Sequence, residues 1–184
     1  MIDLLSKKSE RLTFGLNSRM IGTGRGDLFY IDYIVAKHNN FKNFIELGTF
    51  GGVTSLYIGM IARLRKSTFY TFDISDRRIP CIKDSWLDNM FFMQEDILIS
   101  ANKNVINQIE KENIFLFIDN GNKIKEFSLY VPYLKTNSVV FVHDWNEEIR
   151  ESDIVEIIKQ NNLIPFHNDM AEKLQSSCRG WIKQ

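Results

Sequence analysis

Five short apolar runs, each separated from the next by a segment of helical character, constrain the fold of this chain most strongly. They lie at residues 43–47, 67–72, 90–94, 114–118 and 138–143. Runs this short and continuous are typical of strands buried on both faces of a parallel sheet. Strands that alternate with helices indicate an α/β domain in which right-handed crossovers place helices on both faces of the sheet.

The segments between these runs predict the helices that the crossovers require. Residues 52–66 carry apolar side chains at helical spacing and basic residues at the end, where cations favour a helix C-terminus. Residues 100–113, 123–135 and 152–160 predict three more helices, with Pro132 bending the second and Asp153 as the N-cap of the third. A further helical stripe precedes the first strand, at Leu28, Ile31, Ile34 and Val35.

Two final runs, at residues 163–167 and 177–183, predict an antiparallel pair of strands, with Pro165 suited to a sheet edge. We therefore predict a doubly wound, mostly parallel Rossmann-like sheet with helices on both faces and an antiparallel C-terminal strand pair. The 184 residues are expected to form a single domain, with an N-terminal helical or lid segment at 1–40 and the core at 41–184. The glycine-rich stretch 17–27 is either a lid over a cofactor or an ordinary connecting loop.

Composition narrows the class of partner. Lys plus Arg and Asp plus Glu each number 23, so the formal net charge is zero and no global field favours nucleic acid or an anionic membrane. Cys81 and Cys178 lie far apart in the sequence and are interpreted as free thiols of a reducing compartment. The start of the chain lacks a signal-peptide core, and the longest apolar runs are strand-sized, so we expect a cytoplasmic protein with no membrane partner.

Carboxylates mark the ends of all five parallel strands. They are spaced about one strand–helix unit apart along the chain, and they are Glu46, Asp73, Asp96, Asp119 and Asp144. Because ligands bind at the carboxyl ends of strands in such sheets, these acids predict a site for hydroxyls, amines or a cation. The alternative is that the acids only cap the helices that follow or make the loops polar.

A glycine-rich loop provides the second signal. Gly48, Gly51 and Gly52 follow the first strand and open the first crossover helix, where they let the backbone approach a ligand closely. The spacing is not the G-x-G-x-x-G of a dinucleotide-binding loop.

These residues resemble a known family. FIELGTFGGVTS resembles the first motif of class I S-adenosylmethionine-dependent methyltransferases, and FYTFDIS resembles their second motif. The stretch from FIDNGN to FVHDW is similar to the subset of small-molecule and sugar O-methyltransferases and the cephalosporin hydroxylase-like group. The resemblance covers roughly residues 25–150.

The resemblance implies a role for each matching position. The cofactor S-adenosylmethionine would lie with its methionine part against the glycine loop, its ribose on Asp73 and its adenine amino group near Asp96, while Glu46 orders the loop. Asp119 would face the methionine amine or a metal. The loop residues are Gly48, Thr49, Gly51 and Gly52.

The ends of the fourth and fifth strands would carry the chemistry, since a hydroxyl acceptor needs a general base or a metal that lowers its pKa. Asp119 and Asp144 could bind Mg²⁺ or a related divalent ion, although the Asn of the metal-dependent relatives is missing here. His143 is then a base or a structural residue. Lys123 is either a catalytic lysine or the exposed first residue of a helix, and Trp145 either packs or stacks on substrate.

The leading hypothesis is therefore an S-adenosylmethionine-dependent methyltransferase that O-methylates a small hydroxylated molecule such as a sugar or a natural-product intermediate. The alternatives are an NAD-dependent oxidoreductase on a similar sheet and a non-catalytic domain that binds the cofactor or serves assembly. A homo-oligomer is possible, because a partner subunit could complete the pocket of so short a chain.

Overall fold

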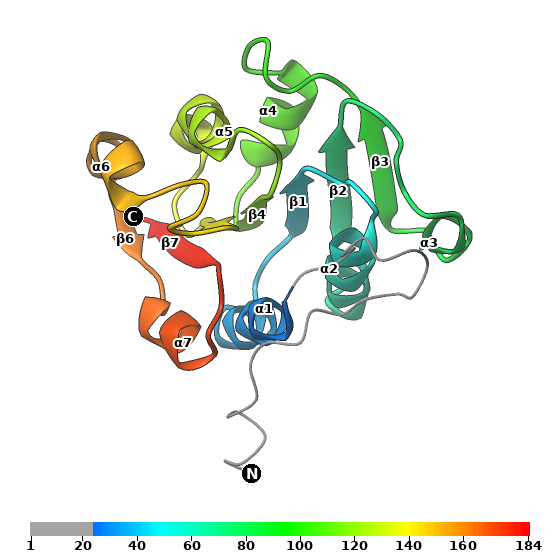
Figure 1. Cartoon of the computed structure of the whole chain (residues 1–184), viewed down its shortest axis with the longest axis horizontal. Coiled ribbons are helices and arrows are strands. Elements are labelled where there is room, and N and C mark those ends of the chain that lie inside the picture. Colours follow the sequence, from blue (N-terminus) through cyan, green and yellow to red (C-terminus); the bar gives the residue numbers. More distant parts are fainter. Residues whose placement is uncertain (1–23) are drawn as a thin grey trace.

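The structure, a computed structural model, describes residues 24–184. Residues 1–23 of the predicted N-terminal segment, including 17–23 of the stretch interpreted as a lid or a connecting loop, lie outside the part described. Its centre is a seven-stranded sheet with the strand order β3-β2-β1-β4-β5-β7-β6 (Figure 1). The strands are β1 (Asn43–Leu47), β2 (Thr68–Asp73), β3 (Met90–Gln94), β4 (Ile114–Ile118), β5 (Val139–Val142), β6 (Leu163–Pro165) and β7 (Arg179–Lys183). Each of the seven strands begins and ends within a few residues of the corresponding predicted run.

The pairing of the strands confirms the predicted fold class. β1 pairs in parallel with both β2 and β4, and the parallel set continues to β3 on one side and β5 on the other. β7 runs antiparallel between β5 and β6, so the C-terminal pair closes one edge of the sheet. Pro165 lies in the edge strand β6, where its missing N–H costs no ladder hydrogen bond.

Helices cover both faces of the sheet (Figure 1). On one face lie α4 (Lys103–Ile109), α5 (Lys123–Tyr130) and α6 (Glu151–Gln160), and on the other lie α1 (Arg25–Lys37), α2 (Val53–Leu64) and α7 (Asn168–Lys173). At Pro132, α5 passes into a short 3₁₀ helix, η1 (Val131–Tyr133). The sequence pattern did not predict α7 or the short α3 (Pro80–Asp84), because a helix of one or two turns is too short to show a periodic stripe.

Each face of the sheet has its own apolar core, and the strands contribute side chains to both cores. In β4 the aromatic residues Phe115 and Phe117 pack with α1 and α2, whereas Leu116 and Ile118 pack with the helices of the opposite face. This alternation follows from the period of two along a strand. A strand buried on both faces is therefore apolar throughout, as the run 114–118 predicted.

Helix α1 belongs to the core, although the sequence placed it in a separate N-terminal segment. Tyr30, Ile31 and Ile34 are fully buried in the cluster that covers the α2 face. The Tyr30 hydroxyl donates to the carbonyl oxygen of Phe166, which joins α1 to the C-terminal part of the chain. The described part of the 1–40 segment is thus packed against the sheet.

The N-cap predicted at Asp153 is wrong by three positions. Helix α6 begins at Glu151 after Arg150, and Asp153 is its third residue, where its Oδ2 accepts the Arg150 N–H at 2.8 Å. The acid still satisfies a free N–H at the helix start, but from inside the first turn.

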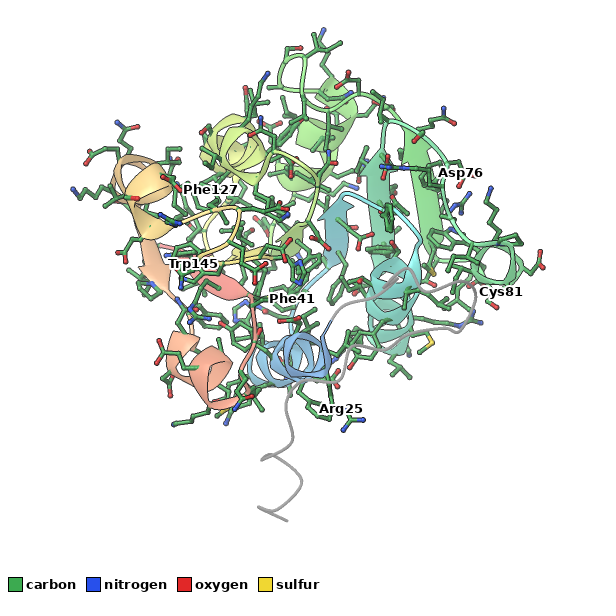
Figure 2. The ribbon with its side chains drawn as sticks, viewed as in Figure 1. Arg25, Phe41, Asp76, Cys81, Phe127 and Trp145 are labelled. Carbon is green, nitrogen blue, oxygen red and sulfur yellow. The ribbon has the colours of Figure 1, made fainter. Side chains whose placement is uncertain are left out.

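The two cysteines are free thiols, as predicted. Cys81 is exposed on α3 at the edge of the molecule (Figure 2). Cys178 is buried and directly precedes β7. Within residues 24–184, no helix has the length and apolar character needed to cross a membrane.

Candidate active site

The site lies where the strand order reverses, between β1 and β4. Gly48 follows β1 with φ +103°, and Asp119 follows β4. A Cβ atom on Gly48 would lie 2.5 Å from the carbonyl oxygen of Asp119, so glycine is required for the two loops to meet. The glycine loop and the turn after β4 therefore meet at the position where ligands bind in such sheets.

Glu46 lies beneath this loop instead of at the rim. It is fully buried within β1, and its Oε2 accepts hydrogen bonds from the hydroxyls of Ser55 and Thr71. Its Oε1 has no hydrogen-bond partner among the described residues. Burial raises the pKa of Glu46 to about 8, despite the two hydrogen bonds, so the carboxyl group is mostly protonated at neutral pH.

The glycine loop is tied to the end of β2. The Thr49 hydroxyl lies 2.6 Å from that of Thr71, and the Phe50 N–H donates to Asp73 Oδ2 at 2.9 Å. Phe50 has φ +44°, an unusual value for an aromatic residue. Gly52, the N-cap of α2, also has a positive φ of +81°.

The two acids predicted to bind the nucleoside part lie at the ends of β2 and β3. The side chain of Asp73 is only 2% exposed, because it also accepts the Ser75 N–H at 3.1 Å and lies 3.5 Å from the Arg77 guanidinium. The Arg77 guanidinium thus lies beside the carboxylate that is predicted to accept the ribose hydroxyls. Asp96 accepts the Leu98 N–H at 2.8 Å and is partly exposed.

His143 is held by three carboxylates. Its Nδ1 lies 2.9 Å from Asp119 Oδ1 and 3.1 Å from Asp144 Oδ1, and its Nε2 lies 3.4 Å from Asp27 Oδ2. Burial opposes the charged imidazolium, but the hydrogen bonds and charges of these acids outweigh it and raise the pKa of His143 well above its ordinary value. The three surrounding carboxylates thus favour the imidazolium form of His143 over the neutral ring that a general base requires.

Lys123 is the first residue of α5, but it is buried and not exposed. Its side chain is 3% exposed, and its Nζ lies 2.6 Å from Glu148 Oε2, 3.0 Å from Asp144 Oδ2 and 3.7 Å from Asp119 Oδ1. Burial disfavours the ammonium, yet the hydrogen bond with Glu148 and the charges of Asp119 and Asp144 raise the pKa of Lys123. The hydrogen bond and charge of His143 lower the pKa of Asp144 in turn, with a smaller contribution from Lys123.

The predicted metal ligands are brought together but are already paired. Asp119, His143 and Asp144 offer three ligand atoms within 4.8 Å of one another. Both carboxylates, however, lie within ion-pair distance of Lys123, and His143 directs the same Nδ1 at both of them. The arrangement fits an internal ammonium and imidazolium better than a divalent ion.

Two members of this cluster were missed from the sequence. Asp27 of α1 is 3% exposed; its Oδ1 accepts the Ser176 hydroxyl and the Ser177 N–H, both at 2.7 Å, and its Oδ2 faces His143. Glu148 follows β5 and binds Lys123. Glu148 could have been suspected from its place a few residues after the His-Asp pair. Asp27 precedes the predicted core of residues 41–184, and no motif in the sequence pointed to it.

Trp145 is a packing residue. Its ring lies 5.4 Å from that of Trp181, which also meets Phe127 of α5 at 5.8 Å, and the residue packs against the core on that face (Figure 2). The preceding residue, Asp144, has φ +55°, a region that Asp tolerates better than most residues. This turn directs Trp145 toward the core while the Asp144 carboxylate faces Lys123 and His143.

The comparisons with known proteins rest on structure alone, because no protein-family model and no curated protein matches this sequence. Among solved structures, cmcI-N160 with SAH has a TM-score of 0.60 at 10% identity, with 97% of this chain and 91% of that chain covered. CalS11, a TDP-rhamnose 3'-O-methyltransferase of calicheamicin biosynthesis, has a TM-score of 0.59 at 10% identity, with 84% and 77% covered.

The chain has the class I methyltransferase fold. The methyltransferase MycE from mycinamycin biosynthesis, in complex with Mg, SAH and mycinamycin VI, supports the same conclusion with a TM-score of 0.55 at 12% identity. The match covers 84% of this chain but only 48% of MycE, so this chain spans about half the length of that enzyme. At these identities the likeness shows the fold, and the chemistry must be argued from the residues of the site.

Proposed function

We propose that this chain is an S-adenosylmethionine-dependent methyltransferase that O-methylates a small hydroxylated acceptor, such as a sugar or a natural-product intermediate. The fold supports the cofactor class, and the site supports the choice within it. The proposal also holds that the protein is cytoplasmic and acts on a small molecule and not on nucleic acid.

The observation that carries this proposal is the charge beside the glycine loop. Four carboxylates contact one another through two cations, Lys123 and His143; the carboxylates belong to Asp27, Asp119, Asp144 and Glu148. Such a site attracts the sulfonium and ammonium groups of S-adenosylmethionine and repels the pyrophosphate of NAD. This charge, together with a glycine spacing that differs from the G-x-G-x-x-G of a dinucleotide-binding loop, favours the methyltransferase over the oxidoreductase.

The roles proposed for the individual residues follow the strand ends. Asp73 accepts hydrogen bonds from the ribose hydroxyls, and Asp96 faces the adenine amino group. Asp119 faces the methionine amine from the opposite side of the glycine loop, which Glu46 supports from below. The loop residues against the methionine part are Gly48, Thr49, Gly51 and Gly52.

The catalytic proposal assigns the proton to Asp119. When bound, S-adenosylmethionine supplies an electrophilic methyl group. The Asp119 carboxylate, 21% exposed, accepts the proton of the acceptor hydroxyl, while His143 holds one of its oxygens at 2.9 Å and fixes its orientation. Lys123 balances the charge from within the cluster. His143 and Lys123 are thus positioning residues, because the surrounding carboxylates favour their protonated forms, which cannot take up the proton.

Calorimetric titration tests the proposal. Wild-type protein is expected to bind S-adenosylmethionine, and Asp73→Asn is expected to weaken binding by about tenfold or more through the loss of charged hydrogen bonds to the ribose. Asp88→Asn is a matched control, because the Asp88 side chain is 80% exposed and its ion pair, within the part of the chain that the structure describes, is with Arg63. Absence of binding by wild-type protein at millimolar cofactor would refute the proposal, and thermal protection by NAD alone would favour the oxidoreductase.

The remaining alternatives are separated by turnover and by mass. Release of S-adenosylhomocysteine with one member of a panel of hydroxylated acceptors supports the enzyme, whereas cofactor binding without turnover supports a binding or assembly domain. Light scattering of the purified protein measures its mass and so tests the proposed homo-oligomer.

A further inference from the structure

The ammonium of Lys123 occupies the centre of the carboxylate cluster. It donates to the carbonyl oxygen of Asn120 at 3.1 Å and to Glu148 Oε2 at 2.6 Å. Asp144 Oδ2 lies 3.0 Å away and Asp119 Oδ1 lies 3.7 Å away. Three protons on Nζ thus have four oxygens within ion-pair or hydrogen-bond reach, and the lysine side chain is almost completely buried.

A divalent ion would need these same oxygens. Mg²⁺ and Ca²⁺ bind carboxylate and carbonyl oxygens at about 2.0–2.6 Å and gain affinity from the number of charged ligands. The oxygens around Lys123 lie at distances typical of hydrogen bonds and ion pairs with an ammonium group. The two nearest carboxylate oxygens, at 2.6 Å and 3.0 Å from Nζ, belong to Glu148 and Asp144. An ion could enter only if the buried lysine left.

His143 gives no free ligand atom to such an ion. Its Nδ1 faces two carboxylate oxygens, from Asp119 at 2.9 Å and Asp144 at 3.1 Å, so this nitrogen carries a proton and has no lone pair to offer. Its Nε2 faces Asp27 at 3.4 Å, away from Lys123. The candidate ligand set is therefore reduced to carboxylates that already have cationic partners.

We propose that Lys123 serves as a built-in cation in the place where this site could otherwise hold a divalent metal ion. The protein then carries its own counter-charge between β4 and β5 and needs no metal to keep Asp119 and Asp144 in place. The consequence for turnover rests on the proposed function, namely that methyl transfer proceeds in the presence of a chelator. The metal-binding statement itself does not depend on the identity of the reaction.

Binding of Mn²⁺, measured by electron paramagnetic resonance without cofactor, tests the proposal. Wild-type protein is expected to bind Mn²⁺ only weakly, with a dissociation constant in the millimolar range. Lys123→Met keeps much of the side-chain length, removes the ammonium and exposes unpaired carboxylates, so its Mn²⁺ affinity should rise by about tenfold or more. Lys125→Met, an exposed lysine of the same helix, is the matched control and should bind like wild type.

Asp144→Asn in the Lys123→Met background should remove the gained binding, which locates the ion. Two results overturn the proposal: saturable micromolar Mn²⁺ binding by wild type that Asp144→Asn abolishes, or a folded Lys123→Met protein with no gain in affinity. If Lys123→Met does not fold, thermal unfolding of wild type decides. A melting temperature unchanged by Mn²⁺ or chelator supports the built-in cation, and a saturable Mn²⁺-dependent rise refutes it.

S-adenosylmethionine titration of the same wild-type sample keeps the two proposals distinct. Failure to bind the cofactor counts against the proposed function alone, whereas tight Mn²⁺ binding counts against the built-in cation alone.

Discussion

Asp27 offers the sharpest test of how the site is held together, because it connects three separate parts of the chain. Its Oδ1 accepts the Ser176 hydroxyl and the Ser177 N–H, and its Oδ2 lies 3.0 Å from the Gly24 nitrogen and 3.4 Å from His143 Nε2. Burial works against its charge, but the hydrogen bond and charge of His143, with the serine hydrogen bonds, lower the pKa of Asp27. The native state therefore favours the ionised form.

Asp27→Asn removes the charge and places an amide donor where an acceptor is needed. A hydrogen bond to a charged group is worth about 1.5–3 kcal/mol, and breaking a fully buried ion pair costs about 3–5 kcal/mol. His143 keeps Asp119 and Asp144 as partners, so we expect a loss at the lower end, about 2–4 kcal/mol. Asp88→Asn should cost less than about 1 kcal/mol, because its pair with Arg63 is exposed to solvent.

The pH of the measurement follows from the direction of the two pKa shifts. The lowered pKa of Asp27 gives stability that is fully present above its ordinary value of 3.8 and is lost as the pH falls through the folded-state value. The raised pKa of His143 gives stability that is fully present below its ordinary value of 6.5 and is lost as the pH rises toward the folded-state value. The stabilising contributions of Asp27 and His143 are both present near pH 6. The free energies of unfolding of wild type and Asp27→Asn should therefore differ most at this pH.

Urea unfolding at pH 6, followed by tryptophan fluorescence, measures the difference. With only three histidines in the chain, NMR can also follow the His143 ring, whose pKa should fall in Asp27→Asn. The reasoning is refuted if Asp27→Asn is no less stable than Asp88→Asn, or if His143 of the wild-type protein titrates at its ordinary value.

Two further predictions concern the glycine loop and the acid beneath it. Gly48→Ala should destabilise the fold by roughly 3 kcal/mol or more, because Gly48 has a positive φ and the new Cβ would lie 2.5 Å from the carbonyl oxygen of Asp119. Gly121→Ala, the control, has open space around the new Cβ and should change stability by less than about 0.5 kcal/mol. Equal urea midpoints for the two variants would contradict this prediction. Between the ordinary pKa of 4.5 and the folded-state pKa of about 8, Glu46 keeps its proton in the native state and loses it in the unfolded state. Its contribution to the free energy of unfolding is therefore fully present below pH 4.5 and is lost as the pH rises through this window. Across that pH range, the free energy of unfolding of Glu46→Gln in urea should rise relative to that of wild type by up to roughly 4 kcal/mol. If the two proteins give parallel pH profiles, Glu46 is already ionised in the native state.

The fold class, the succession of strands and helices along the chain, and the glycine loop could all be predicted from the sequence. These depend on local periodicity: a strand buried on both faces must be apolar throughout, as in Ile114–Ile118, and a crossover helix must carry a stripe, as in α2. The sequence also predicted a shared site for the acids at the strand ends, Asp119 among them, because the carboxyl ends of parallel strands share one edge of the sheet.

The surroundings of the charged residues, by contrast, could be found only in the folded structure. Asp27 enters the site from a helix that precedes the first strand, and Lys123 is buried because carboxylates from two loops converge on it. The state of His143 depends on the three acids around it, which come from positions 27, 119 and 144. Burial and proton affinity arise from groups distant in sequence, so no local pattern could distinguish a free base from an imidazolium or an exposed lysine from an internal cation.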